Sequence, residues 1–375
     1  MKIAFIGSRG IPRCYSGFET FVEELSVRLA ERGHTVTVYN RIPFNTYRKK
    51  EFKGVRIVHL PTILLKSTDT LFHSLICSIH ALFGRYDMIY YCGVGSSLIS
   101  ILPQLFGSRV IINVDGADWA REKWSGLGRW WLRKSESWAA RLGDSVIADH
   151  PVISKRYQEL YGASTDLIPY GANIVEEDPG RDVLEKWSLS SNGYYIYVSR
   201  LTPENGADHV MEEFQCFLND LTPSASSPPQ LVVVGDAPYQ DEFLQKLRSI
   251  AAKTPEIVMT GYVFGDGYAQ LSYHARGFIY PTRIDATRPV VLDQMGFGNP
   301  IISRDTEANR WVVGDAGVYF DFQGERNLAA TLRVLEEDQT VLRKVQLESR
   351  ERIRNQFDWE VVTNQYEDLF RKLSE

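Results

Sequence analysis

The sequence predicts an α/β protein built from two doubly wound, Rossmann-like domains. An apolar strand at residues 3–6, an amphipathic helix at 18–32 and a second strand at 34–39 form a βαβ unit at the start of the chain. The same alternation begins again with a strand at 194–198, after a charged segment with few strand signals. A chain of 375 residues is also long enough for two domains of ordinary size.

The boundary between the two domains is expected in that charged segment. The residues Pro-Tyr-Gly-Ala at 169–172 end the first domain, which we expect to span residues 1–172. The second domain is expected to span residues 190–357. An amphipathic pattern near the end of the chain predicts a last helix at residues 358–375.

Composition and charge exclude several classes of protein. The formal net charge is −5 with both signs mixed, so the chain has no overall basic field and nucleic acid is not an expected partner. The four cysteines show no CxxC spacing, which suits a reducing cytoplasm. The first residues enter a strand directly and do not resemble a signal peptide, and no apolar run reaches the roughly 18 residues of a membrane span. We therefore expect a cytoplasmic protein.

The stretch around which the chain is organised runs through residues 278–300. An apolar strand at 278–280 leads into a loop that holds Asp285, and a short amphipathic helix behind the loop carries Asp293. Both carboxylates can face one cleft at the carboxyl end of a parallel strand, where open α/β sheets bind ligands. An isolated pair of this kind is more often solvated or capping, so its interpretation as a site depends on the context.

Asp115 occupies a similar position in the first domain. It follows the strand at 110–114 and so lies where α/β sheets place catalytic or acceptor-binding residues. The alternative is that Asp115 caps the helix that follows. The loop at 7–19 carries three glycines before a helix start, a pattern that lets backbone N–H groups approach an anion, although packing alone also requires glycines there.

Tryptophans interleave with cations in one region of the first domain. This pattern suits sugar stacking or a surface that rests on a membrane. It suits equally an ordinary helix whose tryptophans pack inward. The residues are Trp119, Trp124, Trp130, Trp131 and Trp138.

Several blocks of the sequence resemble a known enzyme family. "LDQMGFGNP" at 292–300 resembles the donor-sugar loop of retaining glycosyltransferases of family 4, which have the GT-B fold. "GSRGIPRCYSGFETFVEEL" at 7–25 and "INVDGADWAREKW" at 112–124 resemble the β1-4 rhamnosyltransferase-like branch of bacterial polysaccharide synthesis. The resemblance covers almost the whole chain. It implies that the two domains face each other across a cleft, the first binding the acceptor and the second the nucleotide sugar, with the last helix packed back on the first.

The resemblance also implies how the donor diphosphate is bound. Arg200 matches a family arginine that grips it, and Asn205 stands where the wider family has a lysine, although the branch carries the same Pro-Glu-Asn. Lysine supplies a full charge and asparagine only a dipole, so other groups must supply that charge. The expected contributors are Gly17, Thr287 and Arg288, through the guanidinium and through N–H groups at helix starts.

Further residues are implied for the base, the ribose and the sugars. Tyr262 lies in "TGYV", the family segment that holds the nucleotide base. Asp293 is expected to hydrogen-bond the ribose and Asp285 the sugar hydroxyls, and the family has glutamate at both positions. Asp115 is expected to orient the acceptor. The predicted catalytic residues are therefore Asp115, Arg200 and Asp285.

The implied activity is retaining transfer of a hexose from a nucleotide-diphosphate donor to a hydroxyl of a lipid-linked oligosaccharide, in surface polysaccharide synthesis. The branch suggests rhamnose, and other hexoses and nucleotides stay open. No cofactor and no metal are expected, since neither Asp-x-Asp nor metal-ligand spacing occurs. The acceptor would bring the protein to the inner face of the cell membrane as a peripheral protein. The alternatives are a nucleotide-sugar 2-epimerase of the same fold and a catalytically inactive sugar-binding protein.

Overall fold

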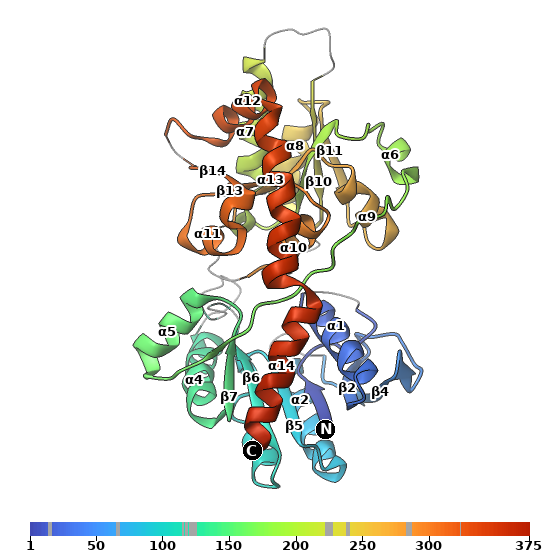
Figure 1. Ribbon diagram of the computed structural model, residues 1–375, viewed down its shortest axis with the longest axis vertical. Helices are drawn as coiled ribbons and strands as arrows, with labels where there is room; N and C mark the ends of the chain where they lie inside the picture. Colours follow the sequence, from blue (N-terminus) through green and yellow to red (C-terminus); the bar gives the residue numbers. More distant parts are fainter. Residues whose placement is uncertain are drawn as a thin grey trace. The chain divides into compact units, whose positions relative to one another are not determined.

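The computed structural model describes the chain except for residues 14–16, 65–67, 115, 117–118, 120–125, 222–227, 238–240, 283–286 and 323. The chain forms two compact α/β units (Figure 1). The first unit comprises Met1–Gly171, Asp285–Thr287 and Trp359–Glu375, and the second comprises Ala172–Ile284 and Arg288–Asp358.

The first unit is built on a parallel sheet with one antiparallel edge pair, β3 and β4. Its strands, in spatial order, are β3 (Glu51–Phe52), β4 (Val55–Pro61), β2 (Thr35–Ile42), β1 (Lys2–Ile6), β5 (Met88–Cys92), β6 (Arg109–Val114), β7 (Ser145–Ala148) and β8 (Asp166–Leu167). After β1 the chain adds β2 on one side of it. It later crosses back and adds β5 on the other side of β1. The winding therefore reverses between β1 and β5, as in a doubly wound fold.

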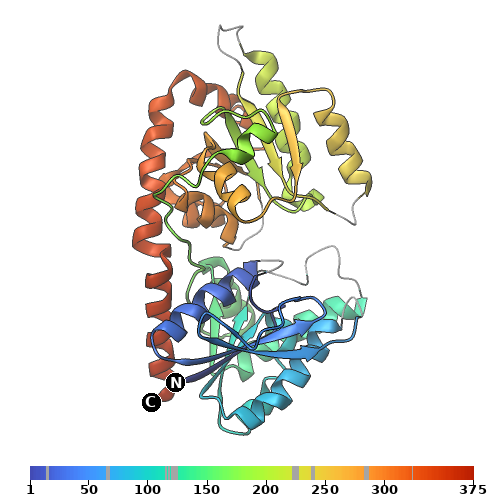
Figure 2. The ribbon, with the colours of Figure 1, turned by 90° about the vertical axis from the view of Figure 1, so that its right-hand side faces the viewer.

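Helices cover both faces of this sheet, with α1 and α14 on one face and α2 on the other (Figures 1 and 2). The last helix is held to the sheet by a buried aromatic cluster, in which the hydroxyls of Tyr90 and Tyr366 lie 3.1 Å apart. Phe21 of α1 packs against both rings. The helices are α1 (Gly17–Glu31), α2 (Asp69–Gly84), η1 (Val94–Ser96), α3 (Ile101–Gln104), α4 (Gly126–Leu142), α5 (Pro151–Tyr161) and α14 (Trp359–Ser374).

The second unit is built on a wholly parallel sheet in the order of the dinucleotide-binding Rossmann fold. Its strands, in spatial order, are β11 (Ile257–Gly261), β10 (Gln230–Val234), β9 (Tyr194–Val198), β12 (Gly277–Tyr280), β13 (Ile301–Arg304) and β14 (Gly317–Phe320). The winding reverses between β9 and β12. The predicted fold class, two doubly wound α/β domains, is confirmed.

Apolar side chains from three helices and the sheet form the core on one face of the second unit. Helices α7, α8 and α12 contribute Phe214, Leu247 and Leu332 to this core, against Tyr195 and Val233 of the strands. The helical elements are α6 (Asp182–Lys186), η3 (Pro203–Asn205), α7 (Ala207–Asp220), α8 (Asp241–Ala251), α9 (Asp266–Tyr273), α10 (Pro289–Gly296), α11 (Glu307–Val313), η4 (Gly314–Ala316), α12 (Leu328–Glu337), α13 (Gln339–Arg352) and η5 (Ile353–Phe357). In the part of the chain that the structure describes, no helix has the length and hydropathy needed to cross a membrane.

Candidate active site

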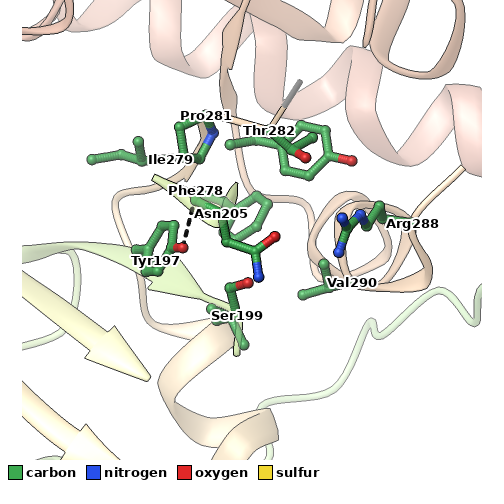
Figure 3. A pocket seen from close by; sticks show the side chains of 11 residues that line it. Tyr197, Ser199, Asn205, Phe278, Ile279, Pro281, Thr282, Arg288 and Val290 are labelled. Atoms are coloured by element: carbon green, nitrogen blue, oxygen red, sulfur yellow. Dashed lines mark hydrogen bonds between the residues drawn. The ribbon is translucent and has the colours of Figure 1, made fainter. Parts of the chain in front are cut away.

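A small cavity lies at the carboxyl ends of β9 and β12, where the winding of the second sheet reverses. Residues 197–199 and 278–282 line it, together with Asn205, Arg288 and Val290. Figure 3 shows Asn205 at its centre, with Tyr197 on one side and Arg288 on the other. Its volume of about 20 Å³ admits a group no larger than a water molecule. A larger ligand at this switch point would therefore lie over the mouth of the cavity.

Asn205 fixes the loop that follows β9. Its side-chain Nδ2 donates to the carbonyl oxygen of Arg200 at 2.8 Å and to Oγ1 of Thr202 at 3.0 Å. Its own carbonyl accepts from the hydroxyl of Tyr197 at 2.9 Å. Gly206, at φ 72°, then turns the chain into α7 through the left-handed region that glycine adopts without strain. The asparagine, 4% exposed, is thus a clamp of the loop backbone.

Two guanidinium groups are available at this edge of the sheet. The side chain of Arg200 is exposed, while Arg288 is half-buried and lines the cavity. Tyr197 lines the same cavity as Arg288. Burial raises the pKa of Tyr197, and a hydrogen bond with Ser199 and the positive charge of Arg288 act on that pKa in the opposite direction. Neither arginine forms an ion pair with a carboxylate in the described ranges. Both charges can therefore serve an anionic ligand.

A second hollow opens beside the first and shares Pro281 with it. Its volume is about 380 Å³, and its lining includes Glu204, Asp208 and His209. Glu204 brings a negative charge to this hollow, and Asp208 is paired with Lys246 at 2.6 Å, so the lining offers a diphosphate less than a free guanidinium does. The anion is better placed on the side of Arg288.

The loops after β9, β10 and β11 are joined by backbone contacts. Asp236 accepts through its carbonyl from the N–H of Leu201 at 3.2 Å and from the hydroxyl of Tyr262 at 3.1 Å. A side chain at position 235 would lie 1.8 Å from the carbonyl oxygen of Ser199, so only glycine permits this approach. Tyr262 is therefore held in a fixed position relative to the loop of Arg200.

Tyr262 and Phe264 form an exposed aromatic pair after β11. Their ring centroids lie 5.7 Å apart at 22°, and Phe264 is 74% exposed. Exposed stacked rings at the ligand-binding edge of a sheet can take a planar base. Of this pair, only Tyr262 is predicted from the sequence to contact the base. The available signal for Phe264 is an aromatic residue two positions after a tyrosine at the end of a strand.

Helix α10 carries Asp293 behind the loop, half-buried. Next to it, Gln294 donates to the hydroxyls of Tyr268 and Ser272, and Asn299 donates to the Gln294 side chain at 2.6 Å. These buried amides hold α10 against α9. Asp293 consequently sits on a rigid helix.

Thr287 belongs to the first unit, unlike Arg288 that follows it. Its backbone N–H donates to Oδ2 of Asp149 at 3.0 Å, and its hydroxyl donates to the Asp149 carbonyl at 2.8 Å. Both residues are buried. The backbone N–H group of Thr287, which is predicted to bind the diphosphate, therefore donates to the carboxylate of Asp149 in this structure.

The glycine-rich loop after β1 is held by two residues of β2. Asn40 exchanges hydrogen bonds with the backbone of Ile11, and Arg41 donates to the carbonyl of Gly7 at 3.0 Å. A Cβ at Gly10 would lie 2.0 Å from the Asn40 side chain. Close packing thus explains Gly10, while Gly17 is the first residue of α1.

Two predicted catalytic residues, Asp115 and Asp285, lie outside the described residues. Arg200, Asn205, Tyr262, Arg288 and Asp293 all belong to the second unit, and Gly17 and Thr287 to the first. Within the described ranges, no three His, Cys, Asp or Glu side chains are grouped so as to hold a metal ion.

Two family models match the chain, one in each of its halves. Residues 15–175 match the family model "Glycosyltransferase Family 4", and residues 193–338 match "Glycosyl transferases group 1". Over 192 residues the chain is 25% identical to the O-antigen chain mannosyltransferase B of Escherichia coli. This alignment covers 51% of the chain and 49% of the relative, so the chain spans about half the length of the curated relative it matches.

Solved structures resemble the chain over nearly its full length. Sucrose-phosphate synthase of Thermosynechococcus elongatus superposes with a TM-score of 0.80 at 20% identity, covering 99% of this chain and 98% of that one. HepE of Anabaena, solved with UDP and glucose, gives 0.77 at 17% identity, covering 99% and 100%. WaaG, a glycosyltransferase involved in lipopolysaccharide biosynthesis, gives 0.73 at 14% identity, covering 98% and 99%.

These similarities establish the class of fold. The chain has the GT-B fold of two Rossmann-like domains with parallel sheets. The two family models, one on each domain, support a glycosyltransferase.

Proposed function

We propose that this protein is a retaining, metal-independent hexosyltransferase of surface polysaccharide synthesis. It moves a sugar, with rhamnose as the first candidate, from a nucleotide diphosphate to a hydroxyl of a lipid-linked oligosaccharide. The observation that carries the proposal is the clamp of Asn205 on the loop after β9, which fixes the backbone of Arg200 and leaves its guanidinium exposed at the switch point. The name of the O-antigen relative supports the polysaccharide context.

The donor lies along the carboxyl edge of the second sheet. Its base stacks on Tyr262 and Phe264, and its ribose meets Asp293 on α10. The diphosphate lies between Arg200 and Arg288, so that Arg288 supplies the charge that asparagine at position 205 does not. The UDP named in the HepE structure is a ligand of the same chemical kind.

Charge stabilisation is the main chemical task of such a site. The bond between the anomeric carbon and the diphosphate oxygen breaks, and the two electrons stay on that oxygen. Preorganised guanidinium groups stabilise this developing charge in the transition state. The acceptor hydroxyl attacks from the same face of the sugar and its proton passes to the departing phosphate oxygen, which gives retention.

The remaining roles follow the resemblance. Asp285 binds the hydroxyls of the transferred sugar, and Asp115 orients the acceptor hydroxyl. Thr287 and Gly17 belong to the first unit, and their roles toward the diphosphate stay predictions. The protein meets its lipid-linked acceptor as a peripheral protein on the inner face of the cell membrane.

A transfer assay on the full chain tests the proposal. Radiolabelled nucleotide sugars are incubated with a lipid-linked acceptor in the presence of EDTA, and label in the lipid fraction is counted. Arg200→Ala should lower turnover by at least about 100-fold, as removal of one charge-stabilising donor does in other enzymes. Arg343→Ala, an exposed arginine on α13, is the matched control and should keep normal activity. Activity of Arg200→Ala within a few-fold of wild type would contradict the assignment.

Incubation with the donor alone separates the proposal from its alternatives. A transferase leaves the nucleotide sugar intact or hydrolyses it slowly. Conversion to the 2-epimer would instead identify an epimerase. A protein that binds sugars but no nucleoside diphosphate in calorimetry would be a binding protein.

A further inference from the structure

Helix α2 turns large apolar side chains to solvent at the centre of its outer face. Leu75, Ile79 and Phe83 follow each other at intervals of four residues, and all three are exposed, Phe83 to 85%. Its buried residues, including His73 and Cys77, lie on the opposite side. A surface helix ordinarily places charged or polar residues where these three lie.

Exposed apolar side chains also lie on the neighbouring elements. Leu105 and Phe106, after α3, are exposed, and at the start of α4 Leu127 is 84% exposed and Trp130 is also exposed. The segment η1 lies between α2 and α4 and forms hydrogen bonds with both. The hydroxyl of Ser96 donates to that of Ser74 on α2, and the indole of Trp131 on α4 donates to the carbonyl of Gly95. We call this surface of α2, η1, α3 and α4 the α2–α4 face.

The charges on the α2–α4 face are of one sign. Lys134 and Arg141 follow Leu127 at intervals of seven residues and are exposed on the same side of α4. Within these four elements, all of them described, the only acidic residues are Asp69 and Glu136. Asp69 forms an ion pair with Arg41, and Glu136 is 1% exposed. The face is cationic on a chain whose formal net charge is −5.

We propose that the α2–α4 face docks on the surface of an anionic lipid bilayer. Large aliphatic and aromatic side chains beside exposed cations are the combination that enters the headgroup region and meets acidic lipids. The cations complement the lipid charge, and the apolar residues project from helices too short and too polar to span. The inference rests on the proposed function in one respect: a lipid-linked acceptor requires the enzyme to work at a bilayer.

Flotation of the full chain with vesicles tests this docking. The protein should float with vesicles of 70% phosphatidylcholine and 30% phosphatidylglycerol, and at least tenfold less with pure phosphatidylcholine. The double variant Ile79→Ser/Phe83→Ser should lower binding to the anionic vesicles by at least tenfold, because two large apolar groups leave the membrane interface. Lys134→Glu/Arg141→Glu should lower it by a similar factor, and added salt should weaken wild-type binding.

Matched variants on the second unit are the controls. Leu347→Ser and Lys344→Glu change exposed residues of α13 and should leave flotation unchanged. Wild-type protein that stays unbound, or α2–α4 variants that float like wild type, would overturn the proposal. A dimer in light scattering that Ile79→Ser/Phe83→Ser dissociates, without vesicle binding, would assign the face to a second copy of the chain.

Nucleotide binding is measured on the same proteins by thermal shift with UDP, guanosine diphosphate and thymidine diphosphate. The α2–α4 variants should keep the wild-type shift, since they lie in the other unit. Loss of vesicle binding with intact nucleotide binding separates the docking surface from the donor site. Failure of nucleotide binding in the wild type would contradict the proposed function and leave the docking result standing.

Discussion

The amide nitrogen of Asn205 donates a hydrogen bond of 2.8 Å to the carbonyl oxygen of Arg200. One side chain thereby sets the conformation of the backbone that presents the exposed guanidinium. A lysine at position 205 could give its charge to a ligand, but it lacks the buried amide that also donates to Thr202. In the proposed site the loop is fixed at this position, and we expect Arg288 to supply the second positive charge.

Removing the clamp should loosen the loop and weaken the donor site. In Asn205→Ala the carbonyl of Arg200 and the hydroxyl of Thr202 lose a common donor. We expect the free energy of unfolding to fall by about 1–3 kcal/mol in urea titrations, the usual cost of leaving buried polar groups unpaired. The affinity for nucleoside diphosphates should fall with it. A variant with the stability and the nucleotide affinity of the wild type would show that Asn205 does not organise the loop.

Arg288 should contribute to binding of the diphosphate group and not to binding of the base. We expect Arg288→Ala to weaken calorimetric binding of a nucleoside diphosphate by tenfold or more, and to change binding of the corresponding nucleoside much less. Equal losses for nucleoside and diphosphate would argue for a collapsed site.

Phe264 should bind the base together with Tyr262. Its exposed ring can be removed without opening a cavity, so Phe264→Ala should keep the stability of the wild type. We expect nucleotide affinity to fall by roughly 1 kcal/mol, a typical value for one aromatic stacking contact. Thermal shift with UDP measures this. Phe106→Ala, an equally exposed ring of the first unit, is the control.

Acid should destabilise the fold through His73. Burial, and to a lesser degree the charge of Arg41, lowers the pKa of His73 to about 3, and the residue is fully buried on α2. The unfolded chain binds the proton near pH 6.5, so the folded protein loses stability as the pH falls below 6.5 towards 3. At pH 5 the cost is about 2 kcal/mol relative to pH 7. Between pH 7 and pH 5 the free energy of unfolding should therefore fall by about 2 kcal/mol less in His73→Gln than in the wild type. An equal fall in both proteins would exclude His73 as the cause.

Glu136 is a buried carboxylate whose loss should be costly. It accepts from Arg156 at 2.8 Å, from the hydroxyl of Tyr161 at 3.0 Å and from the indole of Trp119 at 3.1 Å. Glu136→Ala leaves these groups without their acceptor, and we expect a loss of about 3–5 kcal/mol in unfolding free energy. Glu360→Ala removes an exposed carboxylate and should cost less than about 1 kcal/mol. Similar values for the two variants would contradict the central role of Glu136.

The fold was predictable from the sequence because the apolar periodicity of strands and helices repeats along the chain. The strand at 194–198 and the last helix show this, since each coincides with an element of the structure or lies within two residues of one. The direction of individual side chains was not predictable. The resemblance places Asn205 where the wider family has a lysine, but only the folded loop shows that its amide donates to the carbonyl of Arg200.

The exposure of individual side chains is a second property that could not be predicted from the sequence. From its sequence alone, the apolar run in α2 could be buried on every side. Only the folded structure shows that Ile79 and Phe83 are exposed. Trp131 packs against Trp138 while Trp130 is exposed, and contact of the tryptophans with a sugar or a membrane stays a prediction. The roles assigned to Asp115 and Asp285 stay predictions.

A crystal structure of the protein with a bound nucleoside diphosphate, grown in EDTA, would show the donor site itself. We expect the diphosphate within hydrogen-bond reach of Arg200 and Arg288, and the base against Tyr262 and Phe264. A nucleotide bound elsewhere, or no binding without a divalent cation, would contradict it.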